Sequence, residues 1–143
     1  MKIKLKKLHA NAVVPKFGKP GDAGADLVAT SIEWRTSSQI VYGTGIAVEI
    51  PEGMVGLVFP RSSIRNYDLE MSNSVGVIDS GYRGEVMVTF NVNHLDPSFA
   101  SKYEVGERIA QLIIMPVPLI EYIIVDELSE TVRGTGGHGS TGQ

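Results

Sequence analysis

Short segments rich in Val and Ile, separated by Gly and Pro, limit the folds open to this chain. The 143 residues include sixteen Gly and seven Pro, which favour many turns over long helices. Short runs of β-branched and apolar residues between turn residues are typical of strands. We therefore expect strands at 3–5, 40–42, 46–50, 54–59, 86–92, 109–115 and 120–125.

Only the segment 62–69 is suited to a helix, and it is short. Ser62 or Ser63 would cap this helix, and Ile64 and Leu69 would face inward. The expected fold is an all-β sandwich or distorted jelly roll, with one domain over residues 1–132 and one short helix. Residues 133–143 (RGTGGHGSTGQ) contain five Gly and no aliphatic side chain, so we expect a flexible tail.

Composition excludes several classes of function. The formal net charge is −3, whereas a nucleic-acid-binding surface is normally basic. The absence of Cys excludes disulfides and thiolate sites, and it fits a cytoplasmic protein, or one in a host cytoplasm if a phage encodes it. The longest apolar run, 112–120, contains Pro116 and Pro118 and is too short for a bilayer span. We expect neither a nucleic acid nor a membrane as partner.

The segment GVIDSGYRGEV at 76–86 holds the first candidate for catalysis. Asp79 follows two core-type residues, and the apolar run resumes at Val86. A carboxylate at a turn between two strands is held by rigid backbone on both sides, which suits a general base. The alternative, from these residues alone, is an Asp that caps the turn.

Two segments carry residue types that bind phosphate. Arg61, Ser62 and Ser63 stand where a strand ends and the expected helix begins, a position where free N–H groups attract anions. Ordinary capping by Ser62 is the alternative. In the tail, Arg133 is combined with Gly, Ser and Thr, which suits contact with a polyanion. A flexible linker is the alternative there.

Polar residues at two further segments are candidates for a site. Gln111 lies on the expected strand 109–115 and would point to a ligand, whereas Glu107 and Arg108 would form a surface salt bridge. Asp26 stands between small and apolar residues. It is either a carboxylate behind the ligand-binding residues or the partner of a buried Arg, and both alternatives stay open.

Five segments, in this order and at this spacing, closely resemble the homotrimeric dUTP pyrophosphatases, the dUTPase family. They are AGADL at 23–27, PRSS at 60–63, GVIDSGYRGEV at 76–86, GERIAQLI at 106–113 and RGTGGHGSTG at 133–142. The resemblance implies a jelly-roll-like subunit that assembles as a homotrimer. It also implies Mg²⁺-dependent hydrolysis of dUTP to dUMP and pyrophosphate, which limits uracil incorporation into DNA and supplies dUMP.

The resemblance further implies roles for individual residues. Asp79 would deprotonate the water that attacks the α-phosphorus, and Tyr82 would pack on the deoxyribose and exclude a 2′-hydroxyl. Asp26 would contact the metal through water, with Mg²⁺ held mainly by the substrate phosphates. The uracil edge would be read by the side chain of Asn73 and by backbone groups around Val77, Ile78 and Met87. The phosphates would be held by Arg61, Ser62, Ser63 and Gln111.

The tail would act as a lid over the triphosphate. Its substrate-binding residues would be Arg133, His138, Gly139, Ser140 and Thr141. In the family each site combines the Asp turn of one subunit, the phosphate-holding segments of a second and the tail of a third. Most members carry Phe where this chain has His138, so we expect somewhat weaker stacking on uracil.

Two other functions compete with dUTP hydrolysis. A dCTP deaminase of the same fold would need a Glu on the strand after the turn, where this chain has Thr89, and Thr cannot serve as that base. A non-catalytic binding or regulatory module would have no need to retain Asp79, Tyr82, Arg133 and the Gly-rich tail together.

Overall fold

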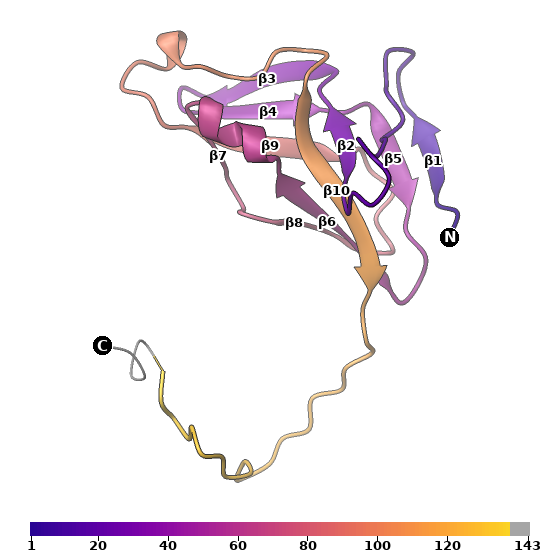
Figure 1. Ribbon diagram of the computed structural model, residues 1–143, viewed down its shortest axis with the longest axis vertical. Helices are drawn as coiled ribbons and strands as arrows, with labels where there is room; N and C mark the ends of the chain where they lie inside the picture. The colour runs from indigo at the N-terminus through magenta and orange to yellow at the C-terminus, as the bar shows by residue number, and fades with distance from the viewer. Residues whose placement is uncertain (138–143) are drawn as a thin grey trace.

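The computed structural model describes residues 1–137, and in that part of the chain almost all regular structure is β (Figure 1). The strands are β1 (Lys4–Lys7), β2 (Ala25–Val28), β3 (Ser31–Thr36), β4 (Gln39–Gly43), β5 (Ile46–Glu49), β6 (Met54–Pro60), β7 (Leu69–Met71), β8 (Gly76–Ile78), β9 (Met87–Val92) and β10 (Arg108–Pro116). Two 3₁₀ helices, η1 (Ser62–Asn66) and η2 (Pro97–Phe99), complete this part. The expected all-β class is confirmed.

The strands form two four-stranded sheets and one pair, all antiparallel. The first sheet has the order β2-β10-β6-β8, the second has β3-β4-β9-β7, and β1 pairs with β5. The chain crosses from the first sheet to the second between β8 and β9. This crossing contains the Asp79 turn.

The core lies between the sheets and is rich in aromatic and β-branched side chains. Tyr42 of β4 and Phe90 of β9 are fully buried and meet edge to face, with their ring centroids 5.6 Å apart. The hydroxyl of Tyr42 donates a hydrogen bond of 3.0 Å to the backbone oxygen of Tyr103, and burial raises the pKa of Tyr42. Leu27 and Val58 of the first sheet belong to the same core. The core therefore contains side chains from both sheets.

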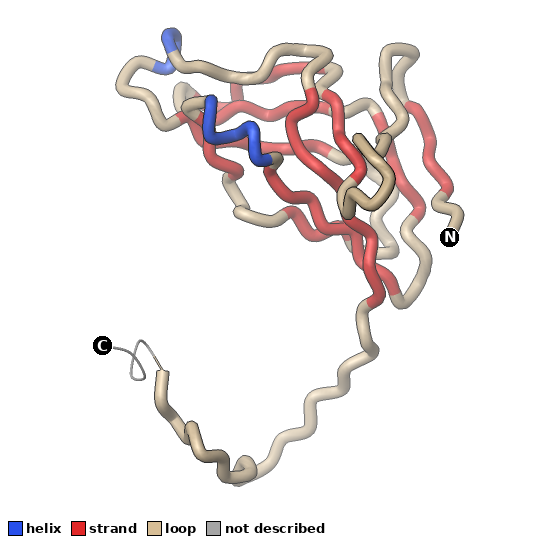
Figure 2. Tube along the Cα trace, in the orientation of Figure 1, coloured by secondary structure: helices blue, strands red, loops and turns tan. Residues whose placement is uncertain are grey.

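Most of the expected strands are confirmed within one or two residues, and the segments 40–42, 46–50, 54–59, 86–92 and 109–115 correspond to β4, β5, β6, β9 and β10. The expected strand 120–125 is wrong, because the chain beyond β10 runs as an extended loop (Figure 2). Leu119 and Ile124 are 103% and 99% exposed. A segment of high β propensity forms a strand only beside a partner strand, and the described chain offers none here.

The expected helix over 62–69 is wrong in length and in type. The segment forms the 3₁₀ helix η1, which begins after Arg61 without a side-chain cap and ends at Asn66. Leu69 instead begins β7, is buried, and lies opposite Val92 of β9. Pairing with β9 therefore ends the helical turn early. The strand expected directly before Asp79 corresponds to β8, whereas β2, β3 and β7 were not expected from the sequence.

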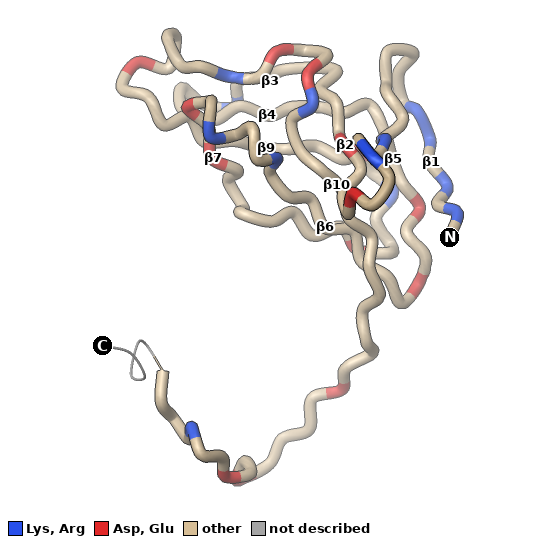
Figure 3. Tube along the Cα trace, in the orientation of Figure 1, with Lys and Arg blue, Asp and Glu red and all other residues tan. Residues whose placement is uncertain are grey.

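The N-terminal strand β1 is a basic outer strand (Figure 3). Lys4 forms an exposed 2.8 Å ion pair with Glu49 of β5. Charged side chains on an outer strand oppose unwanted pairing with other chains. Among the residues that the structure describes, no helix is long and apolar enough to cross a membrane.

Candidate active site

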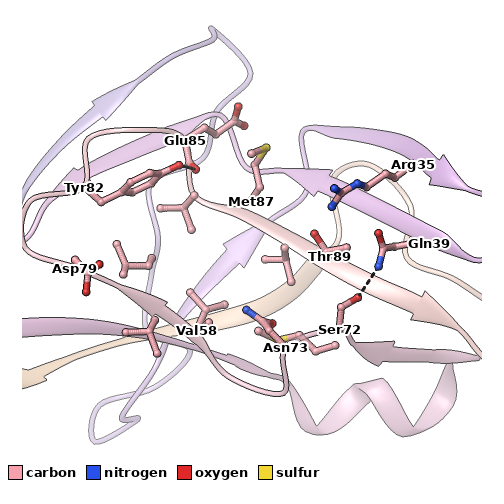
Figure 4. A pocket seen from close by; sticks show the side chains of 16 residues that line it. Arg35, Gln39, Val58, Ser72, Asn73, Asp79, Tyr82, Glu85, Met87 and Thr89 are labelled. Atoms are coloured by element: carbon pink, nitrogen blue, oxygen red, sulfur yellow. Dashed lines mark hydrogen bonds between the residues drawn. The ribbon is translucent and has the colours of Figure 1, made fainter.

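A pocket of about 440 Å³ opens where the chain passes from the first sheet to the second (Figure 4). Among the described residues, β8 is the edge strand of the first sheet and pairs only with β6. In the second sheet, β7 reaches β9 no further than Phe90, so Met87 and Val88 pair only with β4 within the described chain. The two facing backbone edges thus have free hydrogen-bonding capacity, which suits a flat ligand with donors and acceptors along one side.

Asp79 lies at the rim of this pocket, directly after β8. The turn is closed by its backbone oxygen, which accepts a 3.0 Å hydrogen bond from the N–H of Tyr82. The exposed carboxylate has no hydrogen-bond or ion-pair partner in residues 1–137, so it does not cap the turn. It remains available to a ligand or a water molecule.

Asn73 is presented to the same pocket by a tight turn before β8. Ser74 adopts φ 59°, a left-handed conformation that non-Gly residues rarely adopt, and its N–H donates to the oxygen of Met71. On β8 the side chain of Val77 is 65% exposed, whereas that of Ile78 is buried. Of the residues expected to read uracil, Asn73, Val77, Ile78 and Met87 all line the pocket.

Tyr82 borders the pocket beside Asp79, and the residue is 43% exposed. Its hydroxyl donates a 3.0 Å hydrogen bond to the backbone oxygen of Glu85. Three residues for which no role was expected from the sequence also line the pocket, namely Arg35, Gln39 and Glu85, as does Thr89. Pairing of β3, β4 and β9 brings most of them there, and no local sequence pattern marks them.

A second pocket of about 400 Å³ lies on the first sheet. Asp26 of β2 stands opposite Gln111 of β10, and Arg61 follows the last residue of β6. The carboxylate of Asp26 accepts hydrogen bonds from Arg61 Nε at 2.7 Å and Arg108 Nη1 at 3.1 Å. Of the two alternatives for Asp26, the structure therefore supports the Arg partner. The expected Glu107–Arg108 salt bridge is wrong, because Arg108 is paired with Asp26 instead.

Ser62 and Gln111 line this second pocket, but Ser63 does not. The amide of Gln111 donates a 3.1 Å hydrogen bond to the oxygen of Pro60. The hydroxyl of Ser63 accepts a 3.1 Å hydrogen bond from Arg61 and lies 3.4 Å from the hydroxyl of Tyr103, whose pKa is raised by burial. In this structure Ser63 orients the guanidinium of Arg61.

The two pockets share no lining residue, so the structure does not bring Asp79 together with Arg61. Arg133 lies in the extended C-terminal segment, where its Nε donates to the oxygen of Gly136. The remaining expected tail residues, His138, Gly139, Ser140 and Thr141, lie outside the described residues.

The described residues contain no group of three His, Asp or Glu side chains placed to hold a metal ion. Asp26, the expected metal-contacting residue, uses both carboxylate oxygens in ion pairs with Arg side chains. This donor set fits an ion carried by substrate phosphates, with Asp26 in reach only through water. Among residues 1–137 this donor set does not match a site in which several protein side chains bind the ion directly.

Comparison with known proteins places this chain in a family. The family described as dUTPase matches residues 10–142. A deoxyuridine 5'-triphosphate nucleotidohydrolase of Nocardia farcinica is 43% identical over 142 residues, covering 98% of this chain and 85% of that protein. A relative of the same description from Picosynechococcus sp. is 42% identical over 144 residues, covering 99% of both chains.

Solved structures agree with the sequence comparisons. The dUTPase of Staphylococcus bacteriophage 80alpha with dUPNHPP superposes with a TM-score of 0.86 at 31% identity, covering 99% of both chains. A mutant dUTPase from phage phi11 of S. aureus, described with a structural Mg(II) ion, gives a TM-score of 0.75 at 26% identity and covers 89% of this chain and 98% of that one. The similarity confirms the expected jelly-roll fold, and the chain belongs to the dUTPase family.

Proposed function

We propose that this chain hydrolyses dUTP to dUMP and pyrophosphate. The observation that carries the proposal is the exposed carboxylate of Asp79, which has no partner among residues 1–137, at the rim of a pocket with two open backbone edges. Uracil presents alternating carbonyl and N–H groups, which the backbone of β8 and β9 and the side chain of Asn73 can match. The family and the names of the relatives support the same substrate.

Asp79 acts as the general base in the proposed reaction. Its carboxylate takes a proton from a water molecule while the water oxygen bonds to the α-phosphorus. The bond from the α-phosphorus to the α–β bridging oxygen breaks, and pyrophosphate leaves with that oxygen. The protein's main contribution is to position the water and the phosphates, because phosphoryl transfer depends mostly on geometry and charge neutralisation.

The second pocket supplies the phosphate contacts in this proposal. Arg61 and Ser62 donate to phosphate oxygens, and Gln111 does so once its amide turns from Pro60. Because the two pockets share no residue, each site takes its Asp79 pocket and its phosphate pocket from different chains of a homotrimer. The tail from residue 133 onward closes over the triphosphate as a lid that a third chain supplies.

We propose that Mg²⁺ is bound by the phosphates of the nucleotide and not by a cage of protein side chains. Bound there, the ion neutralises negative charge on the phosphate oxygens. Asp26 holds the guanidinium of Arg61 in place and reaches the ion only through water.

Tyr82 distinguishes deoxyribose from ribose by excluding a 2′-hydroxyl, because its ring borders the pocket beside Asp79. Thr89 lines the same pocket and offers no carboxylate, which favours hydrolysis over deamination. We propose that the reaction takes place in the cytoplasm, where nucleotide pools are made, or in a host cytoplasm if the gene belongs to a phage.

Pyrophosphate release from dUTP, dCTP, dTTP and UTP in the presence of Mg²⁺ tests the function directly. We expect selective turnover of dUTP by the wild type and none by Asp79→Asn, which keeps the shape of the side chain and removes its basicity. Equal turnover by Asp79→Asn, or release of ammonia from dCTP, would refute the proposal.

A further inference from the structure

The ring of Tyr82 is held in place by two residues of the same turn, Gly84 and Glu85. The Tyr82 hydroxyl donates to the backbone oxygen of Glu85 at 3.0 Å, so the ring folds back over the residues between them. Figure 4 shows this ring beside the pocket, with Asp79 on one side and Glu85 on the other. A half-exposed ring with one end fixed in this way has little freedom to move.

The ring of Tyr82 packs directly against Gly84. A Cβ atom on Gly84 would lie 2.5 Å from Cζ and 3.0 Å from Cε2 of Tyr82, so a side chain and the ring cannot both occupy this space. The backbone of Gly84 is not in the positive-φ region, unlike that of Gly45 with φ 67°. The conformation of residue 84 is therefore open to other residues, and contact with the ring is what requires glycine there.

Glu85 is itself hydrogen-bonded to the loop between β4 and β5. Its carboxylate accepts a 2.7 Å hydrogen bond from the N–H of Gly45, and a Cβ atom on Gly43 would lie only 2.8 Å from the carboxylate oxygen. The next residue, Val86, donates from its N–H to the oxygen of Ile46 at 2.9 Å. These bonds fix the backbone oxygen that anchors the Tyr82 hydroxyl.

We propose that Gly84 and Glu85 are positioning residues that set the discrimination against ribonucleotides. A ring that tests for a single hydroxyl must be placed within a fraction of an ångström, because a small displacement opens room for the extra oxygen. Gly84 sets how closely the Tyr82 ring approaches the backbone of the turn. Glu85 holds the hydroxyl end of the ring through its backbone oxygen. This inference rests on the proposed function, and it adds residues that do not themselves contact the sugar.

Gly84→Ala tests the inference, and Gly81→Ala is its matched control. Gly81 lies in the same turn, is also outside the positive-φ region, and a Cβ atom there would meet nothing within 4 Å. We expect the ratio of kcat/KM for dUTP over UTP to fall about tenfold or more in Gly84→Ala, the usual effect of losing one steric contact, and to stay at the wild-type value in Gly81→Ala. The melting temperature should change little, because Tyr82 is 43% exposed and its displacement leaves the buried core intact.

A double-mutant cycle separates this role from a general effect on the fold. In a Tyr82→Ala background, Gly84→Ala should have no further effect on the dUTP to UTP ratio, since the ring through which it acts is gone. Glu85→Gln, which keeps an acceptor for the N–H of Gly45, should retain the ratio, and Glu85→Ala should lower it. An unchanged ratio in Gly84→Ala, or an equal loss with and without Tyr82, would overturn the inference.

The selectivity of the wild type and of Gly84→Ala can also be compared by measuring the affinity for the non-hydrolysable imido analogues of dUTP and UTP. These affinities do not need turnover, so a wild type that binds the deoxy analogue selectively but does not hydrolyse dUTP would refute the proposed reaction alone. Loss of selectivity in Gly84→Ala would still support the positioning role in that case. Unchanged selectivity in Gly84→Ala would refute the positioning role whether or not the wild type hydrolyses dUTP.

Discussion

Replacing Asp26 by Asn removes the charge that holds two Arg side chains at the phosphate pocket. The carboxylate is 2.7 Å from Arg61 and 3.1 Å from Arg108, and the side chains are 16%, 22% and 56% exposed respectively. A charge-assisted hydrogen bond in a mostly buried setting contributes about 1.5–3 kcal/mol, whereas the exposed Arg108 contact adds less than about 1 kcal/mol. Asn keeps one acceptor oxygen, so we expect the free energy of unfolding to fall by about 2 kcal/mol.

This loss should be visible as a fall in melting temperature of about 6–10 °C for a chain of this size. It should also lower kcat/KM for dUTP by about tenfold or more, because Arg61 would no longer be held toward the phosphates. Thermal unfolding and steady-state kinetics, both at one fixed protein concentration, measure the two effects.

Glu49→Gln is the matched control for Asp26→Asn. It removes an ion pair of similar length, 2.8 Å, in which the Lys4 and Glu49 side chains are 81% and 44% exposed. Such exposed pairs contribute little, so we expect no measurable change in melting temperature or in kcat/KM. If Asp26→Asn behaved like this control, or if both variants lost the same stability, the role given to burial and to Arg61 would be wrong.

Three further predictions concern single side chains around the two pockets. Thr44→Val should lower the free energy of unfolding in urea by about 1–2 kcal/mol, because the buried Thr44 hydroxyl donates to the oxygen of Val86, and Thr44→Ser should lose less. The free energy of unfolding should fall as the pH rises above about 10, because Tyr42 ionises there in the unfolded chain whereas burial raises its pKa in the folded protein. Tyr42→Phe should weaken this fall, as measured by urea titrations at pH 8–11. Gly24→Ala should raise KM for dUTP with little change in melting temperature, since its Cβ would lie 2.5 Å from the side chain of Gln111; an unchanged KM would contradict this role.

The strands that were predicted correctly from the sequence are those in which strand propensity and turn residues lie within the segment itself. Ile46–Glu49 and Met54–Pro60 combine apolar residues with Gly and Pro at their ends, so propensity and turn signals agree. Ser31–Thr36 was missed because its polar, exposed residues carry a weak pattern, and it is a strand only because it pairs with β4. The segment 120–125 shows the reverse error, since it has strand chemistry but no partner among the described residues.

The part of the candidate site that lies in a single turn could be predicted from the sequence. The part that depends on the pairing of distant strands could not. Asp79 and Tyr82 lie within one short segment, in which Asp79 was a candidate base beside the alternative of turn capping and Tyr82 had a role only through the family resemblance. Asp26 and Arg61 are 35 residues apart, so their ion pair depends on the alignment of β2, β10 and β6. The pocket itself depends on β8 and the start of β9 lacking a shared ladder, which no local pattern encodes.

The division of the site between two pockets has a physical consequence for assembly. Both pockets are built on β6, because Val58 lines the first and Arg61, directly after the strand, lines the second. β6 is paired on both sides at residues 56–58 and with β10 as far as Pro60, so this strand is not expected to bend and bring the two pockets together, which supports a site shared between chains. The exposed apolar side chains after β10, such as Leu119 and Ile124, likewise find no cover among residues 1–137.

The proposed trimer resolves both features, and a mixing experiment tests it. Asp79→Asn and Arg61→Ala chains should each be inactive alone. When they are unfolded together in equal amounts and refolded, about a quarter of the sites should combine an intact Asp79 from one chain with an intact Arg61 from another. Activity should therefore return to about a quarter of the wild-type value. No recovery in a mixture that has refolded and assembled would show that each site uses both residues of one chain, against the geometry of β6.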